Sequence, residues 1–243
     1  MFVIRFFRVA IRATLGVLWT LGVHYFLIAI PNAFTGQRRR LEAISRWGKG
    51  LSVIMGIHVR KKNAPPEMMG DVILSNHMGF LDIPVLLQFF PAVFVIKTEL
   101  QKVPFFGARL MAQGHVFVDR GSKSSRENAR IGIGAVLADG DRIIVFPEGR
   151  ASPGVQRPPW APASLQLAQR LGKKVQVCLV DYLPNRQLLK WDIAKPTLPQ
   201  LANLLGRRRI DISIQFFPLQ DVNDPVQDAA AWKSRIETQL AMQ

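Results

Sequence analysis

The chain has 243 residues, 49% of them hydrophobic, so it is long enough for one globular domain with an appendage and too apolar to be disordered. Its 32 Lys and Arg against 17 Asp and Glu give a net charge of +15, which favours anionic partners: nucleic acid, acidic lipid headgroups or phosphorylated molecules. The single cysteine, Cys178, excludes an intrachain disulfide and a cysteine-based metal cluster, and its apolar neighbours predict a buried thiol.

The N-terminal part of the chain is both basic and apolar. Residues 1–70 hold eleven basic and two acidic residues, and the 22 residues 13–34 carry no formal charge. Basic and apolar residues together favour a membrane surface over nucleic acid. The segment fits a spanning helix, a helix or hairpin in the membrane plane, or a signal peptide, although no small-residue cleavage site follows. We expect residues 1–37 to be a membrane anchor of open geometry and residues 38–243 to form the folded domain.

The rest of the chain alternates between strand-like and helix-like runs. The first expected helix, residues 38–55, has apolar residues at three- and four-residue steps. The expected strands are residues 57–61, 72–75, 93–96, 116–118, 143–146, 175–180 and 210–217. The other expected helices are residues 83–89, 105–113, 125–138 and 225–242, and the proline-rich residues 151–162 are expected to form a loop. This alternation predicts an α/β fold, a largely parallel central sheet flanked by helices.

Two polar segments each follow an apolar strand. His77 and Asp82 come after strand 72–75, and Glu148 and Gly149 come after the apolar residues that begin at Ile143. Because ligands bind beyond the carboxyl ends of parallel strands, the two segments could converge on one site. If Asp82 opens a helix, its carboxylate can fold back onto the imidazole, which then takes a proton from a substrate hydroxyl near neutral pH. A plain alternative makes Asp82 a helix N-cap and residues 147–149 an exposed turn.

Taken together, these segments resemble the glycerolipid acyltransferases, above all the bacterial 1-acylglycerol-3-phosphate (lysophosphatidic acid) acyltransferases. The likeness extends over about residues 40–180. It rests on Asn76-His77-x4-Asp82, on Phe146-Pro147-Glu148-Gly149, and on a signature between them: Lys97-Thr98-Glu99-Leu100, Pro104-Phe105-Phe106-Gly107 and Gly114-His115-Val116-Phe117-Val118-Asp119-Arg120.

The resemblance implies transfer of a fatty acyl group from acyl-CoA or acyl-carrier protein to the hydroxyl of a lysophospholipid, without cofactor, metal or covalent enzyme intermediate. His77 would be the general base and Asp82 the residue that orients it. The implied substrate-binding residues are Asn76, Gly114, Phe117, Arg120, Glu148, Gly149 and Arg150, with the two arginines as phosphate contacts. The resemblance also implies phospholipid biosynthesis at the bacterial cytoplasmic membrane. Because thioester donors are made in the cytosol, we expect the catalytic domain to face the cytoplasm.

Some residues depart from the family pattern. Gly79 stands where a small hydroxyl residue is usual, Arg150-Ala151-Ser152 replaces Thr-Arg-Ser, and Val177-Cys178 replaces the late-strand proline. These differences bear on the acceptor more than on catalysis, so another lysolipid, such as a lyso-ornithine lipid, stays open. The alternative from another class is a non-catalytic basic protein that docks on anionic membranes. A serine hydrolase is disfavoured because the sequence has no Gly-x-Ser-x-Gly, and the sequence shows no nucleic-acid-binding motif.

Overall fold

The computed structural model describes residues 2–24, 26, 38–65, 70–102, 107–152, 154–182, 184, 186, 188–189, 191–192 and 194–242. The strands in this part of the chain form one seven-stranded sheet in the order β1-β7-β6-β2-β5-β3-β4. Their bounds are β1 Ile57–Lys62, β2 Val72–Ser75, β3 Val93–Lys97, β4 Val116–Val118, β5 Ile143–Val145, β6 Val175–Asp181 and β7 Ile210–Phe216.

The sheet is largely parallel, as predicted. From β6 through β2, β5 and β3 to β4, every neighbouring pair is parallel. β7 pairs with β6 antiparallel, and β1 joins β7 in parallel, so these two strands run opposite to the other five. The carboxyl ends of the five parallel strands therefore lie at a common edge.

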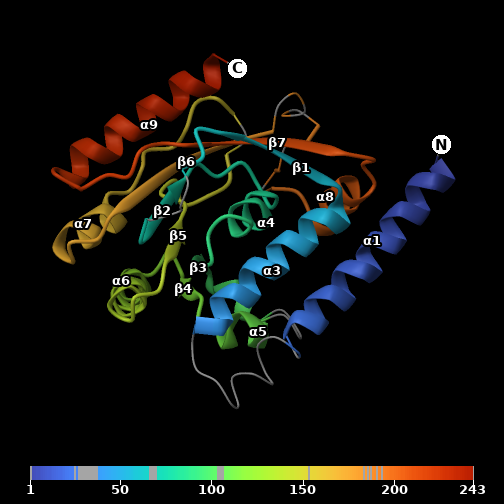
Figure 1. The fold of residues 1–243 in the computed structure, drawn as a ribbon, viewed down its shortest axis with the longest axis horizontal. Coiled ribbons are helices and arrows are strands. Elements are labelled where there is room, and N and C mark those ends of the chain that lie inside the picture. The colour runs from blue at the N-terminus through green and yellow to red at the C-terminus, as the bar shows by residue number, and fades with distance from the viewer. Residues whose placement is uncertain are drawn as a thin grey trace.

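Helices cover both faces of the sheet (Figure 1). α6, α7 and α9 lie along one side of the sheet, α3 and α4 pack together on the other, and α1 lies outermost beside α3 (Figure 1). The helix bounds are α1 Phe2–Gly22, α3 Arg38–Met55, α4 Asp82–Leu87, α5 Gly107–Ala112, α6 Lys123–Ala138, α7 Ala163–Arg170, α8 Thr197–Leu205 and α9 Pro225–Ala241, with a 3₁₀ helix, η2, at Thr98–Lys102. The flanked α/β sandwich predicted from the alternation of elements is confirmed.

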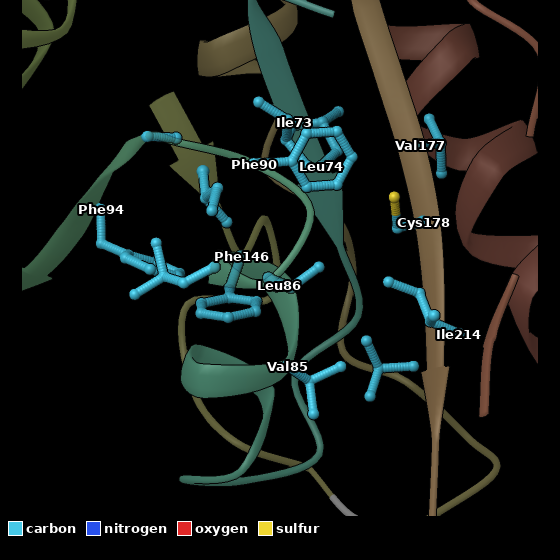
Figure 2. Packing of buried hydrophobic residues seen from close by; sticks show 14 of the residues in the cluster. Ile73, Leu74, Val85, Leu86, Phe90, Phe94, Phe146, Val177, Cys178 and Ile214 are labelled. Carbon is cyan, nitrogen blue, oxygen red and sulfur yellow. The ribbon is translucent and has the colours of Figure 1, made fainter. Parts of the chain in front are cut away.

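The hydrophobic core lies on both faces of the central strands. All seven residues of β6 are buried, as expected for a strand covered on both sides, whereas β7 alternates between buried and half-buried residues. Figure 2 shows side chains from β2, α4, β6 and β7 that belong to the same core cluster as Phe146, the residue that follows β5. This rigid core holds the ends of β2 and β5 in fixed positions.

The predicted elements agree closely with the observed ones where their pattern is long or apolar. Helix 38–55 and strands 72–75 and 116–118 have the predicted bounds, and the other predicted strands differ by one residue. α7, α8 and η2 were not predicted; α7 is short and follows a proline-rich loop, and α8 carries Pro199 in its first turn, where proline is tolerated. The first two residues of the predicted helix 105–113, like Pro104 of the family signature, lie outside the described residues.

The N-terminal helix differs from the predicted apolar segment. α1 begins at Phe2, so Arg5, Arg8 and Arg12 lie within the helix rather than before it. Residue 25 and residues 27–34 of the uncharged segment lie outside the described part of the chain. Within the described part, no helix combines the length and the apolar character that crossing a bilayer requires.

Candidate active site

The polar segments that follow β2 and β5 lie side by side at one edge of the sheet. β2 and β5 are parallel neighbours, with Leu74 opposite Val145, so both strands end at the same edge. Beyond these ends, the ring of His77 stacks on the ring of Phe146, with centroids 4.0 Å apart and planes 11° from parallel. The two segments therefore converge, as their positions after neighbouring parallel strands predicted.

His77 and Asp82 form a hydrogen-bonded pair. His77 Nδ1 lies 2.7 Å from Asp82 Oδ2, and the carboxylate is fully buried whereas the imidazole keeps 20% of its surface exposed. The loop folds back because the backbone N–H groups of Met78 and Gly79 donate to the same carboxylate oxygen, at 2.7 and 3.0 Å. A carboxylate on Nδ1 favours the tautomer with its proton there, which leaves the Nε2 lone pair to accept a proton from a substrate.

The plain alternative for these residues does not hold. Asp82 is the first residue of α4, and the N-cap is Leu81, which makes no side-chain cap hydrogen bond. Glu148, which this alternative placed in an exposed turn, is buried. The carboxylates of Asp82 and Glu148 therefore form hydrogen bonds with neighbouring loops, and neither caps a helix nor faces solvent.

Tyr182 is a third member of the buried group and was not predicted. Its hydroxyl donates to Asp82 Oδ1 at 2.6 Å, from the residue directly after β6. Burial raises the pKa of Tyr182 well above its ordinary value, and the charge of Asp82 adds to that shift. The hydroxyl therefore stays protonated and remains a donor to Asp82.

Asn76 joins the ends of β2 and β6. Its Nδ2 donates to the carbonyl of Val180 at 2.8 Å, and its Oδ1 accepts the N–H of Val180 at 2.8 Å. The side chain is fully buried. Its predicted contact with substrate stays a prediction, and in this structure the amide aligns the two strands beneath His77.

Glu148 forms a buried ion pair with Arg157. Arg157 Nη2 and Nε donate to the two carboxylate oxygens at 2.6 and 2.8 Å, and neither side chain has exposed surface. Burial raises the pKa of the Glu148 carboxyl, and the charge of Arg157 and its hydrogen bonds oppose that shift. The carboxylate thus faces the protein interior, and its predicted role in binding the acceptor stays a prediction.

Arg120 reaches from the end of β4 to the loop after β5. Gly149 has φ +73°, and a Cβ there would lie 3.6 Å from Arg120 Nε, so the guanidinium packs over this glycine. Partial burial lowers the pKa of Arg120, and the charge of Glu99 opposes that shift, but the side chain still has an exposed surface. Arg150, the next residue of the loop, is also exposed. Two cations therefore stand close to the segment that carries Glu148.

Gly114 and Phe117 lie along the chain before Arg120. Gly114 has φ +72°, a backbone conformation that favours glycine, and a Cβ there would lie 2.6 Å from Nη1 of Arg40, so a larger residue would also displace this arginine. Arg40 in turn pairs with Asp141 at 2.8 Å. Phe117 is half-buried on β4. The structure gives Gly114 a role in the turn that leads to Arg120, and the predicted substrate contacts of both residues stay predictions.

Cys178 is buried in the core, as predicted. It has no exposed surface, and Figure 2 shows it among Leu74, Val177 and Ile214. Burial raises the pKa of its thiol well above the ordinary range, so the thiol stays protonated and unreactive. Over the described residues, no three His, Cys, Asp or Glu side chains are grouped so as to hold a metal ion.

Comparison with known proteins identifies the family. The model of the family described as Acyltransferase matches residues 56–181, just over half of the chain, and includes β1 to β6 with the residues of the site described above except Tyr182, which lies one residue beyond the match. The chain belongs to the acyltransferase family. It is therefore an enzyme, and this replaces the alternative of a non-catalytic basic protein that only docks on anionic membranes.

Relatives of this acyltransferase carry two kinds of name. The 1-acyl-sn-glycerol-3-phosphate acyltransferase of Neisseria gonorrhoeae is 26% identical over 207 residues, 84% of this chain and 81% of the relative. A lyso-ornithine lipid O-acyltransferase of Rhizobium meliloti is 32% identical over 108 residues, 44% of this chain and 37% of that protein. The crystal structure of the 1-acyl-sn-glycerophosphate (LPA) acyltransferase PlsC of Thermotoga maritima has the same fold, with TM-score 0.60 and 20% identity over 96% of this chain and 98% of that one.

Two residues of the acyltransferase site escaped the sequence analysis. Tyr182 directly follows β6, a strand that neighbours β2, and Arg157 lies in the loop that was recognised only by its prolines. Their partners, Asp82 and His77, are 100 and 80 residues away along the chain. Only the order of strands in the sheet could have pointed to Tyr182, and no local signal distinguishes Arg157 from the other arginines.

Proposed function

We propose that this acyltransferase moves a fatty acyl group from a thioester donor to the free hydroxyl of lysophosphatidic acid, forming phosphatidic acid. The observation that carries this proposal is the pairing of His77 with the buried Asp82 beside the loop that holds Arg120 and Gly149. A base and a phosphate-binding cation at one edge of the sheet are what direct acyl transfer to a phosphorylated alcohol requires.

The reaction needs one proton to move twice. His77 Nε2 takes the proton of the acceptor hydroxyl as its oxygen attacks the thioester carbonyl, and Asp82 stabilises the imidazolium that forms. When the tetrahedral intermediate collapses, the carbon–sulfur bond breaks and the imidazolium returns the proton to the thiolate that leaves. The products are the new ester and the free thiol of CoA or of the carrier protein.

Arg120 is the residue proposed to bind the acceptor phosphate. Its guanidinium lies over Gly149, where no side chain separates it from the loop, and it is exposed to solvent. A guanidinium presents two parallel N–H groups that match two phosphate oxygens. Arg150 is the proposed second phosphate contact, from the same loop as Gly149.

A lyso-ornithine lipid is the second candidate acceptor. It is favoured by the Rhizobium meliloti relative, whose identity to this chain is higher over a shorter stretch than that of the Neisseria gonorrhoeae protein. The same base would serve both acceptors, because each presents a hydroxyl to be acylated. The two differ in the group that Arg120 would meet, and this difference can be measured.

Helix α1 is proposed to attach the enzyme to a membrane. Eight of its large apolar side chains point into solvent with exposed fractions from 47 to 64%: Val3, Ile4, Phe6, Phe7, Ile11, Leu15, Val17 and Leu18. Soluble surfaces rarely expose so long an apolar face, and a helix of this kind can lie at the boundary of headgroups and acyl chains. The acceptor is itself a membrane lipid, so such a helix would bring the site to its substrate.

The donor and the cellular location follow from the same chemistry. Acyl-CoA and acyl-carrier protein are both acidic, and either suits a chain of net charge +15. Because such thioesters are made in the cytosol, the enzyme is proposed to work at the cytoplasmic face of the bacterial cytoplasmic membrane. Residues 1–37 as anchor and 38–243 as catalytic domain remain the proposed division of the chain.

The proposal is tested by measuring thiol release from palmitoyl-CoA and from palmitoyl-carrier protein with a panel of lysolipids. We expect release with lysophosphatidic acid, and loss of that release in His77→Ala while the circular dichroism spectrum stays that of the wild type. Release with lyso-ornithine lipid alone would move the enzyme to the second candidate. A folded His77→Ala variant with most of its activity would overturn the role of the base.

Arg120→Ala tests the phosphate contact separately. A hydrogen bond to a charged group contributes about 1.5–3 kcal/mol, so KM for lysophosphatidic acid should rise about tenfold or more while KM for the donor changes little. Equal increases for both substrates would contradict a phosphate-specific role. The same variant assayed with lyso-ornithine lipid shows whether the contact depends on phosphate.

A further inference from the structure

Arg157 is a buried arginine whose donors are all used. It lies in the loop between β5 and α7, and its side chain has no exposed surface. Nε and one N–H of Nη2 donate to Glu148, and the second N–H of Nη2 donates to the carbonyl of His77 at 2.8 Å. Nη1 donates to the carbonyls of Ser152 and Gly154. These five contacts to oxygen account for the five N–H groups of a guanidinium, and Nη1 also lies 3.5 Å from Sδ of Met78.

The guanidinium therefore joins three pieces of backbone. It connects the loop after β2, through His77, to the loop after β5, through Glu148, and both to its own segment. The carbonyl of His77 receives a second donor, the N–H of Ser152, at 2.7 Å. Two hydrogen bonds from residues 152–157 thus hold the backbone of the residue whose ring is held by Asp82.

We propose that Arg157 is a positioning residue for acyl transfer, and that Glu148 acts through it rather than on the substrate. Arg157 fixes where the backbone of His77 stands relative to the loop of Gly149, and Asp82 fixes how its ring is turned. The inference rests on the proposed role of His77 as base. It gives Glu148 a function that agrees with its burial, because a carboxylate without exposed surface cannot meet a lipid headgroup.

Only arginine meets this geometry. The planar fork of the guanidinium binds both oxygens of Glu148 along one side and still reaches three carbonyls along its other sides. A lysine ammonium has three donors on one nitrogen and retains the charge without spanning these groups. Replacement by lysine therefore keeps the ion pair with Glu148 and removes the bridge to His77.

The first test compares Arg157→Lys with a matched control. We expect kcat with lysophosphatidic acid to fall about tenfold to a hundredfold, since displacement of a catalytic group by about 1 Å has effects of that size, and KM for both substrates to stay within about twofold. The control is Arg186→Lys, which alters another arginine bound at 2.6 Å to both oxygens of a buried carboxylate, Asp181. It should retain the wild-type kcat.

The outcomes of this comparison are distinct. A folded Arg157→Lys enzyme with wild-type kcat overturns the proposal, as does a loss of kcat equal to that of Arg186→Lys. A rise in KM for the acceptor alone also overturns it, because Glu148 and Arg157 would then act on the acceptor.

A double-mutant cycle tests the second part of the inference. Glu148→Gln, Arg157→Met and the double variant should lose kcat to a similar extent, because either change breaks the same bridge and the double variant leaves no unpaired buried charge. Losses that multiply in the double variant would mean that Glu148 contributes independently, and would overturn the claim that it acts through Arg157.

A readout without substrate separates this inference from the proposed function. The proton of His77 Nδ1, held by Asp82, can be followed by NMR in wild type and Arg157→Lys. A displaced backbone should shift or broaden this resonance in Arg157→Lys and leave it unchanged in Arg186→Lys. An unchanged resonance in Arg157→Lys overturns the positioning role even if no acceptor is turned over by the wild-type enzyme.

Discussion

At the scale of single residues, the site is organised around one carboxylate. Asp82 accepts hydrogen bonds from His77 Nδ1, from two backbone N–H groups and from the hydroxyl of Tyr182. Four donors on two buried oxygens leave the carboxylate no freedom to rotate. The orientation of His77 therefore depends on the side chain of Tyr182, which lies 100 residues after Asp82 in the chain, in addition to the local turn.

Tyr182→Phe should slow the reaction without preventing folding. The variant keeps the ring and leaves Asp82 Oδ1 without its donor. A buried acceptor that loses its partner costs about 1–3 kcal/mol, and about 1.4 kcal/mol of transition-state energy is a factor of ten, so kcat should fall about tenfold. Steady-state kinetics check this, with KM for both substrates expected to stay unchanged.

Ser164→Ala is the control for this variant. Ser164 is also buried, and its Oγ has no hydrogen-bond partner in the described structure, so the substitution removes a buried hydroxyl without touching Asp82. Its kcat should equal that of the wild type. If Tyr182→Phe were as active as this control, Asp82 would not depend on Tyr182.

His115 makes the stability of the fold depend on pH. The N–H of Phe94 donates to its Nδ1 at 3.0 Å, and its Nε2 lies 3.0 Å from Oε1 of Gln113, which fits the neutral tautomer with the proton on Nε2. Burial, aided by the charge of Arg40, lowers the pKa of His115 from 6.5 to about 4. Between these two values the unfolded chain binds more protons than the folded one, so stability is lost as pH falls.

The loss should reach about 3–3.5 kcal/mol on going from pH 7 to below pH 4, because the pKa falls from 6.5 to about 4 and each pKa unit corresponds to about 1.4 kcal/mol. Denaturant unfolding at a series of pH values measures it. His115→Asn keeps an acceptor near the position of Nδ1 and removes the titration, so its stability should fall less over the same range. Parallel pH profiles for both proteins would exclude His115 as the cause.

At the scale of elements, most of the framework could be predicted from the sequence. β2 and β4 have the predicted bounds because each is a short apolar run ended by polar residues, and the placement of His77 after β2 followed from this. What could not be predicted depends on partners far away in the chain. The buried state of Glu148 depends on Arg157, and the docking of α1 depends on α3 and α8, so neither has a local sequence signal.

The arginines of α1 illustrate this. In the sequence they are the basic flank of an apolar segment, a pattern typical of contact with anionic lipid. In the structure, Arg8 Nη1 donates to the carbonyl of Gly206 at 3.0 Å, and Arg12 Nη1 donates to the carbonyls of Leu205 and Arg207 at 3.1 and 2.5 Å. These carbonyls belong to the end of α8, where backbone acceptors lack helical partners and cations are stabilised.

Arg12→Ala should therefore loosen α1 from the domain. Removing a charged donor from two backbone carbonyls costs about 1.5–3 kcal/mol for each hydrogen bond, so α1 and the end of α8 should both open more readily. Hydrogen–deuterium exchange measures this as faster exchange over residues 2–22 and 203–210. Arg130→Ala removes an exposed pair with Glu127 and should leave these segments unchanged. Equal exchange rates in both variants would contradict the role of Arg12 in holding α1 against the end of α8.

At the scale of the whole molecule, the two faces of α1 have different surroundings: one face lies against the domain and the other faces solvent. The side chains of Arg8 and Arg12 point toward α8, and the large apolar side chains point into solvent. Because the inward face of the helix, with Arg8, Arg12, Val9 and Trp19, is held by α8, α3 and the core, its outward apolar face is free to enter a lipid surface while the domain stays attached. The net charge of +15 would add a long-range attraction to anionic membranes that salt weakens.

The double variant Phe7→Glu/Ile11→Glu tests this arrangement. Both side chains are more than half exposed, at 57 and 56%, so the change should not disturb the core. Burying one large apolar side chain contributes about 1.5–3 kcal/mol, so binding to vesicles of anionic phospholipid should weaken at least about tenfold. Vesicle sedimentation measures this, and activity on a short-chain, water-soluble acceptor should stay that of the wild type. Ile131→Glu, which alters an apolar side chain on α6 with 65% exposure, should bind vesicles normally. Unchanged binding of the double variant would mean that the attraction is electrostatic and that α1 does not enter the membrane.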